Sequence, residues 1–217
     1  MTNKFSTLFL LWLIATTMHA QRGTVISHYL FPEFTAGQVL MKDGTLNPAM
    51  LNYNAITEEI VFQQNGQVLA LADPALSQTD TVFISDRKLV PYEDEFAELI
   101  LNGDVKLLAL LRCKVIPPGN PAPFGGTSQI SSVDNISRWG ANNTYYDLNL
   151  PDDYKIETNY MYRIDNGSGW KKVNSMKQLR KFYKKKSDRF DQYVSEQNIT
   201  FDEPARIAEL VQWMEAE

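Results

Sequence analysis

Short apolar runs separated by turn residues dominate the chain between residues 38 and 115. The runs EEIVFQQ and QVLALA flank Asn65-Gly66, and FAELIL and DVKLLALLRCKVI flank Asn102-Gly103. Asn-Gly between two apolar runs is typical of a β-hairpin, because both residues tolerate positive φ. A helix over residues 94–101 is the alternative for one run, but short runs without helical spacing favour a β-meander.

Further segments have the same strand character. In DYKIETNYMYRI, every second residue from Tyr154 to Ile164 is apolar, aromatic or threonine, which predicts one buried face. The other expected strands are GQVLMKDGT, AMLNYN, TVFIS, RKLVPY, YYDLNL and WKKVN.

Helical spacing replaces this pattern near the C-terminus. Ser175 and Gln178 have the spacing of a capping box. Apolar residues three and four apart predict an amphipathic helix over residues 171–194, broken near Ser187, with its apolar stripe on the sheet and its lysines in water. We expect Asp202 to cap a final helix that has Pro204 in its first turn.

Strands first and helices last predict an α+β fold. We expect an antiparallel β-meander or barrel-like sheet followed by two or three short C-terminal helices. The expected organisation is a signal peptide over 1–20, a β-rich domain over 21–170 and a helical C-terminal segment over 171–217 packed on it. A composition of 44% hydrophobic and 22% charged residues suits such a globular protein.

The N-terminus has the pattern of a secretory signal peptide. Lys4 precedes an apolar run over residues 8–14, and small or polar residues lead to Ala20. The run is too short for a membrane span, which needs ~20 residues; a buried N-terminal helix is the alternative. We expect cleavage between Ala20 and Gln21 and an exported protein, periplasmic or secreted. No cysteine follows the run until Cys113, so we do not expect a lipid anchor.

Residues that carry chemistry are scarce. After residue 20 the chain has one histidine, His28, and one cysteine, Cys113, which argues against the usual zinc sites and histidine-based triads. Cys113 lies in an apolar run and is expected to be a buried thiol. Glu58 and Glu59 should point to opposite faces of a strand. The acidic clusters at 93–95 and 152–153 lack the ligand spacing of a calcium loop.

We therefore name no catalytic, cofactor-binding or metal-binding residue, and we expect no cofactor. Carboxylates distant in sequence could still meet in the fold, so the question of enzymatic activity stays open. The residues themselves favour a protein without enzymatic activity.

The segment 117–132, PPGNPAPFGGTSQISS, contains four prolines and a glycine pair. It lacks the lysine of a phosphate-binding loop and the G-x-S-x-G of a nucleophile elbow. Prolines remove backbone donors, which excludes a central strand. We expect an exposed, mobile loop without a cofactor; a ligand-binding lid is the alternative.

Positive charge is concentrated between Lys171 and Arg189. That segment holds nine Lys or Arg and one Asp, whereas the rest of the chain after residue 20 holds 11 basic and 25 acidic residues. We expect a solvated face docked against the acidic sheet; contact with an anionic surface such as lipopolysaccharide or phospholipid is the alternative. An overall pI of about 5.2 argues against a dedicated nucleic-acid binder.

Several strings together resemble a known set of proteins. K-D-G, L-N-Y-N, N-G-x-x-x-A-L-x-D-P and GGTSQ, with the helical tail, resemble uncharacterised exported β-rich proteins of Bacteroidota that have a short helical C-terminal tail. The resemblance implies a bacterial setting and export, and no activity.

These observations favour a non-catalytic exported binding or envelope-assembly protein whose ligand or envelope partner is unknown. The alternative is an envelope hydrolase that uses carboxylates brought together by the fold.

Overall fold

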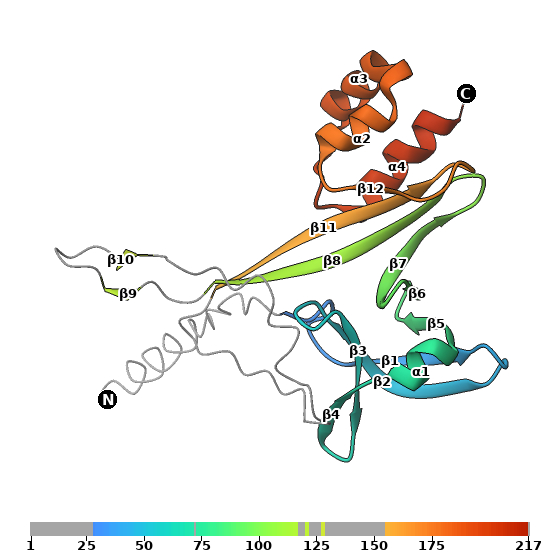
Figure 1. Ribbon diagram of the computed structural model, residues 1–217, viewed down its shortest axis with the longest axis vertical. Coiled ribbons are helices and arrows are strands. Elements are labelled where there is room, and N and C mark those ends of the chain that lie inside the picture. Colours follow the sequence, from blue (N-terminus) through green and yellow to red (C-terminus); the bar gives the residue numbers. More distant parts are fainter. Residues whose placement is uncertain (1–27, 72, 117–119, 122–126, 129–154, 217) are drawn as a thin grey trace, which may run out of the picture.

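The computed structural model describes residues 28–71, 73–116, 120–121, 127–128 and 155–216. Most of them form one large, open antiparallel sheet of ten strands in the order β12-β11-β8-β7-β6-β5-β1-β2-β3-β4, followed by short C-terminal helices (Figure 1). This confirms the α+β fold expected from the sequence.

The elements have the following bounds. The strands of the large sheet are β1 (Thr35–Met41), β2 (Leu46–Asn54), β3 (Glu59–Gln64), β4 (Gln67–Ala70), β5 (Thr79–Ile84), β6 (Arg87–Tyr92), β7 (Glu95–Asn102), β8 (Lys106–Ile116), β11 (Lys155–Asp165) and β12 (Lys171–Val173). The short strands β9 (Asn120–Pro121) and β10 (Thr127–Ser128) pair with each other. The helices are α1 (Asp73–Gln78), α2 (Met176–Phe182), α3 (Ser187–Gln197) and α4 (Pro204–Glu215), with a 3₁₀ turn η1 (Lys184–Lys186).

The turns follow the sequence signals in part. Asn65 and Gly66 both have positive φ, 52° and 76°, and connect β3 to β4 as an Asn-Gly hairpin should. Residues 95–102 are strand β7, so the helical alternative was wrong. The β7–β8 hairpin is present, but neither Asn102 nor Gly103 has positive φ. Its connection is the three residues 103–105.

Two large hydrophobic cores hold the fold together, and a smaller buried cluster lies on the opposite face of β7 and β8. The first lies where α2, α3 and α4 cover one end of the paired strands β8 and β11 (Figure 1). The second is lined by residues from β1, β2, β3 and β5 to β8, whose curled sheet wraps around it. Alternation along β8 explains its part in both: Leu107 and Ala109 face the helices, and Leu111, on the same face, enters the second core.

The helical segment differs in detail from the expectation. Residues 171–173 form the edge strand β12, not helix, because they pair with Tyr162–Ile164 of β11. The helix starts at Met176 and is broken at 183–186, close to the expected Ser187. Leu179, Tyr183 and Phe190 lie in the first core, as the apolar stripe predicted.

The predicted caps are confirmed in one case and wrong in the other. Ser175 Oγ accepts the N–H of Gln178 at 3.3 Å, and Gln178 Oε1 accepts the N–H of Asn174 at 2.8 Å, one residue earlier than in a standard capping box. At the last helix, the N-cap is Glu203 instead of Asp202, because Pro204 is the first helical residue.

Three expectations fall wholly or mostly outside the described residues. These are the signal peptide over 1–20, the strand YYDLNL and the loop over 117–132, of which only β9 and β10 are described.

A substitution at Gly37 in β1 tests how β1 pairs with its two neighbouring strands. A Cβ there would overlap the carbonyl oxygen of Phe83 in β5 and lie 2.8 Å from Leu51 Cδ1 in β2. We expect Gly37→Ala to lower the free energy of unfolding by about 1–3 kcal/mol, measured by urea denaturation. Gly103→Ala is the control, since nothing lies within 4 Å of its Cβ position. A Gly37→Ala protein as stable as the control would contradict the β2-β1-β5 pairing.

Candidate functional site

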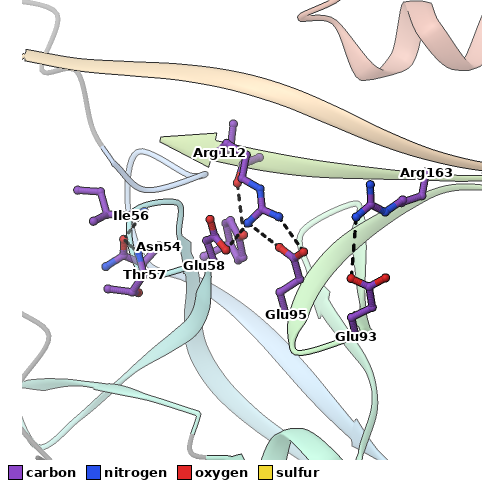
Figure 2. A network of polar contacts seen from close by, with 10 residues as sticks. Asn54, Ile56, Thr57, Glu58, Glu93, Glu95, Arg112 and Arg163 are labelled. Carbon is purple, nitrogen blue, oxygen red and sulfur yellow. Dashed lines mark hydrogen bonds and ion pairs between the residues drawn. The ribbon is translucent and has the colours of Figure 1, made fainter. Parts of the chain in front are cut away.

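A polar network lies where the β2–β3 turn approaches β7 and β8 (Figure 2). Arg112 from β8 reaches Glu95 at the start of β7, with Nη2–Oε1 and Nη1–Oε2 distances of 2.7 Å. Its Nη1 also contacts Glu58 of the β2–β3 turn. Arg163 of β11 forms a neighbouring ion pair, 3.9 Å from Glu93 Oε2. We call these five residues the Arg112 network.

The local structure explains why these side chains meet. Leu111 turns into the second core, so Arg112 points to the opposite face of β8. Glu58 was expected within a strand, with its side chain on the face opposite to that of Glu59. That was wrong: Glu58 lies in the turn before β3 with a φ of 62°, which directs it to Arg112.

Burial decides the electrostatics of the network. The side chains of Arg112 and Glu95 are only 20% and 13% exposed. Burial raises the pKa of the Glu95 carboxyl, and the charge of Arg112 opposes that shift. The Tyr53 hydroxyl, 3.4 Å from the Leu111 carbonyl oxygen, adds a second link between β2 and β8. The network therefore joins the two sides of the curled sheet.

Glu58 and Glu95 are one pair of carboxylates that the fold brings together from different elements. Both contact the guanidinium of Arg112, which lies between them and holds each as a hydrogen-bond acceptor (Figure 2). A general acid and base must instead reach a bound substrate. This geometry serves structure better than proton transfer.

Among the described residues, Glu98 of β7 is a second largely buried carboxylate whose pKa is shifted. Burial raises its pKa, while Arg87, 3.3 Å away, lowers it. Glu98, Tyr53 and Tyr160 line a small cavity of about 10 Å³, which is room for one water molecule. Glu98 also lines an open hollow of about 800 Å³ between β6, β7 and the start of α4, together with Arg87 and Glu203.

The remaining chemical candidates from the sequence are Cys113 and His28. Cys113 is half-buried, and burial raises its pKa to about 11, so it is a thiol at neutral pH. The His28 ring lies against Tyr29, with ring centroids 4.1 Å apart and ring planes tilted by 39°. Among the described residues, no three His, Cys, Asp or Glu side chains are placed to hold a metal ion.

The second candidate site is a basic surface on the C-terminal module, by which we mean β12 and the helices α2, α3 and α4. Its six members are exposed, and none forms an ion pair with any described residue. The Lys171 ammonium lies 5.1 Å from the centroid of the Phe182 ring. We call this set the lysine surface; it consists of Lys171, Lys172, Lys177, Lys181, Lys184 and Lys185.

The other three cations of the basic segment have structural partners. Lys186 Nζ donates to the Met214 carbonyl at 3.0 Å, and Arg189 donates to the Trp213 carbonyl at 2.9 Å. Both complement the C-terminal end of α4, where carbonyls lack helical partners. Arg180 makes a two-pronged ion pair with Asp191, at 2.6 and 2.7 Å. The fold thus divides the segment into cations that stabilise it and cations left to solvent.

A shallow hollow of about 560 Å³ lies in the lysine surface, between β12 and α2. Lys171, Lys172 and Lys181 line it, together with the polar side chains of Asn174 and Gln178. Ammonium groups and amides around an open hollow suit an anionic partner, because both can donate hydrogen bonds to oxygen.

Comparison with protein-family models, curated proteins and solved structures found no match to this chain. The resemblance to exported proteins of Bacteroidota stays an expectation from the sequence. In the part of the chain that the structure describes, no helix has the length and apolar character to cross a bilayer.

Proposed function

We propose that this chain is a non-catalytic exported binding or envelope-assembly protein that docks on an anionic partner through the lysine surface. The observation that carries the proposal is the set of six exposed lysines without ion pairs among the described residues. Lys186, Arg189 and Arg180 beside them are all engaged.

The physical basis is the local concentration of like charge. The apolar stripe of α2 and α3 is buried against the sheet, which holds the lysines on the outside of the module. Neighbouring ammonium groups repel each other, and a polyanion relieves that repulsion. Attraction of this kind weakens as salt screens it. The N-terminal pattern supports an exported setting, where anionic lipids and polysaccharides are available.

Charge variants test the proposal. The triple variant Lys181→Gln, Lys184→Gln, Lys185→Gln should bind dextran sulfate about 100-fold more weakly than wild type, since each lysine near an anionic surface contributes ~1 kcal/mol. Fluorescence anisotropy of the labelled protein in low-salt buffer measures the affinity.

The matched control removes three exposed lysines from the sheet: Lys88→Gln, Lys106→Gln and Lys114→Gln. It should bind within about twofold of wild type, because these lysines lie outside the lysine surface. Equal losses in the two triple variants would show that only net charge matters and would contradict the proposed site.

A further inference from the structure

Trp170 lies directly before the lysine surface and is 40% exposed, one of the most exposed large apolar side chains of the described residues. Tyr92 packs edge-on against it, with ring centroids 5.6 Å apart at 76°. Arg163 lies over the Tyr92 ring at 5.5 Å. The indole is therefore held at the border of the sheet by neighbours that the fold positions.

We propose that Trp170 and the lysine surface together dock on the surface of an anionic phospholipid bilayer, with the indole at the level of the lipid headgroups. This rests on the proposed function and names its partner. Tryptophan suits the boundary between water and lipid, because its ring is apolar and its N–H is a donor.

Strand register places cations on both faces of β12, the strand that follows the indole. Lys172 is paired with Arg163, so it shares the face on which Arg163 and Tyr92 lie. Lys171 is on the opposite face, beside Phe182. Since β12 is the last strand of the sheet, no described strand covers its outer edge. Lys171 and Lys172 line one open hollow together with Lys181 of α2, so a surface that approaches this edge meets lysines from both faces of the strand.

The exposed indole distinguishes a bilayer from a soluble polyanion. A polysaccharide or nucleic acid would satisfy the lysines and leave the ring in water, whereas a bilayer interface removes apolar area from water as well. The nearby Glu93 carboxylate would be repelled by an anionic surface. The Arg163 guanidinium, 3.9 Å away, offsets that repulsion.

The test uses the exported form that begins at Gln21 and vesicles of phosphatidylglycerol and phosphatidylcholine, with pure phosphatidylcholine as the neutral control. Wild type should sediment with the anionic vesicles and not with the neutral ones. Brominated anionic lipid should quench the tryptophan fluorescence of wild type, and Trp170→Phe should remove most of that quenching. The quenching experiment on wild type needs no substitution and is independent of any folding defect.

The affinities for vesicles and for dextran sulfate distinguish the bilayer inference from the proposed function. Trp170→Ala should bind anionic vesicles at least about fivefold more weakly and bind dextran sulfate as wild type does, because only the bilayer contacts the ring. If Trp170→Ala binds vesicles as wild type, or bromolipid does not quench, the bilayer inference is wrong while the lysine surface stands. If Lys181→Gln, Lys184→Gln, Lys185→Gln loses neither vesicles nor dextran sulfate, the proposed function itself fails.

Discussion

Leu210→Ala should lower the free energy of unfolding by about 2–5 kcal/mol. Leu210 of α4 is fully buried in the core that the helices share with β8 and β11. Truncation removes buried methyl groups and leaves a cavity that tightly packed neighbours fill only in part. Urea denaturation followed by circular dichroism and by tryptophan fluorescence measures the loss, and both probes should report one shared transition.

The control for this substitution is Leu46→Ala. Leu46 is 52% exposed at the start of β2, so the same truncation should change stability by less than about 0.5 kcal/mol. A small effect of Leu210→Ala, or separate transitions for helices and sheet, would mean that the C-terminal module is not packed on the sheet as the structure shows.

Arg112→Gln should destabilise the protein by about 2 kcal/mol at neutral pH. The substitution leaves the largely buried Glu95 carboxylate without the guanidinium that holds it, and it removes the contact to Glu58. Partial exposure of the network keeps the loss below that of a fully buried ion pair. Arg180→Gln breaks an ion pair on the open surface and should leave the unfolding midpoint close to wild type.

The loss in Arg112→Gln should depend on pH. Burial already raises the pKa of Glu95 in the folded protein above its ordinary value of 4.5, and losing Arg112 removes the main opposing charge. The folded variant then binds a proton more tightly than the unfolded chain. Its stability is therefore highest below the unfolded pKa and falls as the pH rises through the folded pKa.

The difference in the free energy of unfolding between Arg112→Gln and wild type should accordingly shrink as the pH falls from neutral toward 4.5. Glu95→Gln in the Arg112→Gln background should restore part of the stability at neutral pH, since it removes the unpaired charge. A difference that is the same at both pH values, together with no rescue, would contradict the role assigned to Glu95.

The strands were predictable because their signals are local. Asn65-Gly66 specifies its own turn, and alternation along 155–164 specifies which face is buried, whatever the rest of the chain does. The helix α1 was missed, since its six residues are too few for a periodic pattern. The loop over 103–105 also differs from the Asn-Gly expectation, because pairing between β7 and β8 shifts register near Leu99 and overrides the turn preference.

The Arg112 network could not be predicted, because Glu58 and Arg112 are far apart in the sequence and meet only through the curl of the sheet. One signal was present: Arg112 is the single charged residue in the apolar run over 107–113. The basic segment was recognised from composition. Composition could not show which of its cations have partners, because the carbonyls that accept from Lys186 and Arg189 belong to α4.

Retention in the cell envelope is a direct measure of docking through the lysine surface. A bacterial host should export wild type and the triple variant Lys181→Gln, Lys184→Gln, Lys185→Gln, and the protein in the envelope pellet should be quantified before and after a wash in 1 M salt, where the screening length is ~3 Å. Wild type should be retained in the pellet and released by the wash, and the variant should remain in the soluble fraction. Retention of the variant equal to wild type, or retention of wild type that salt does not reverse, would contradict docking through the lysine surface.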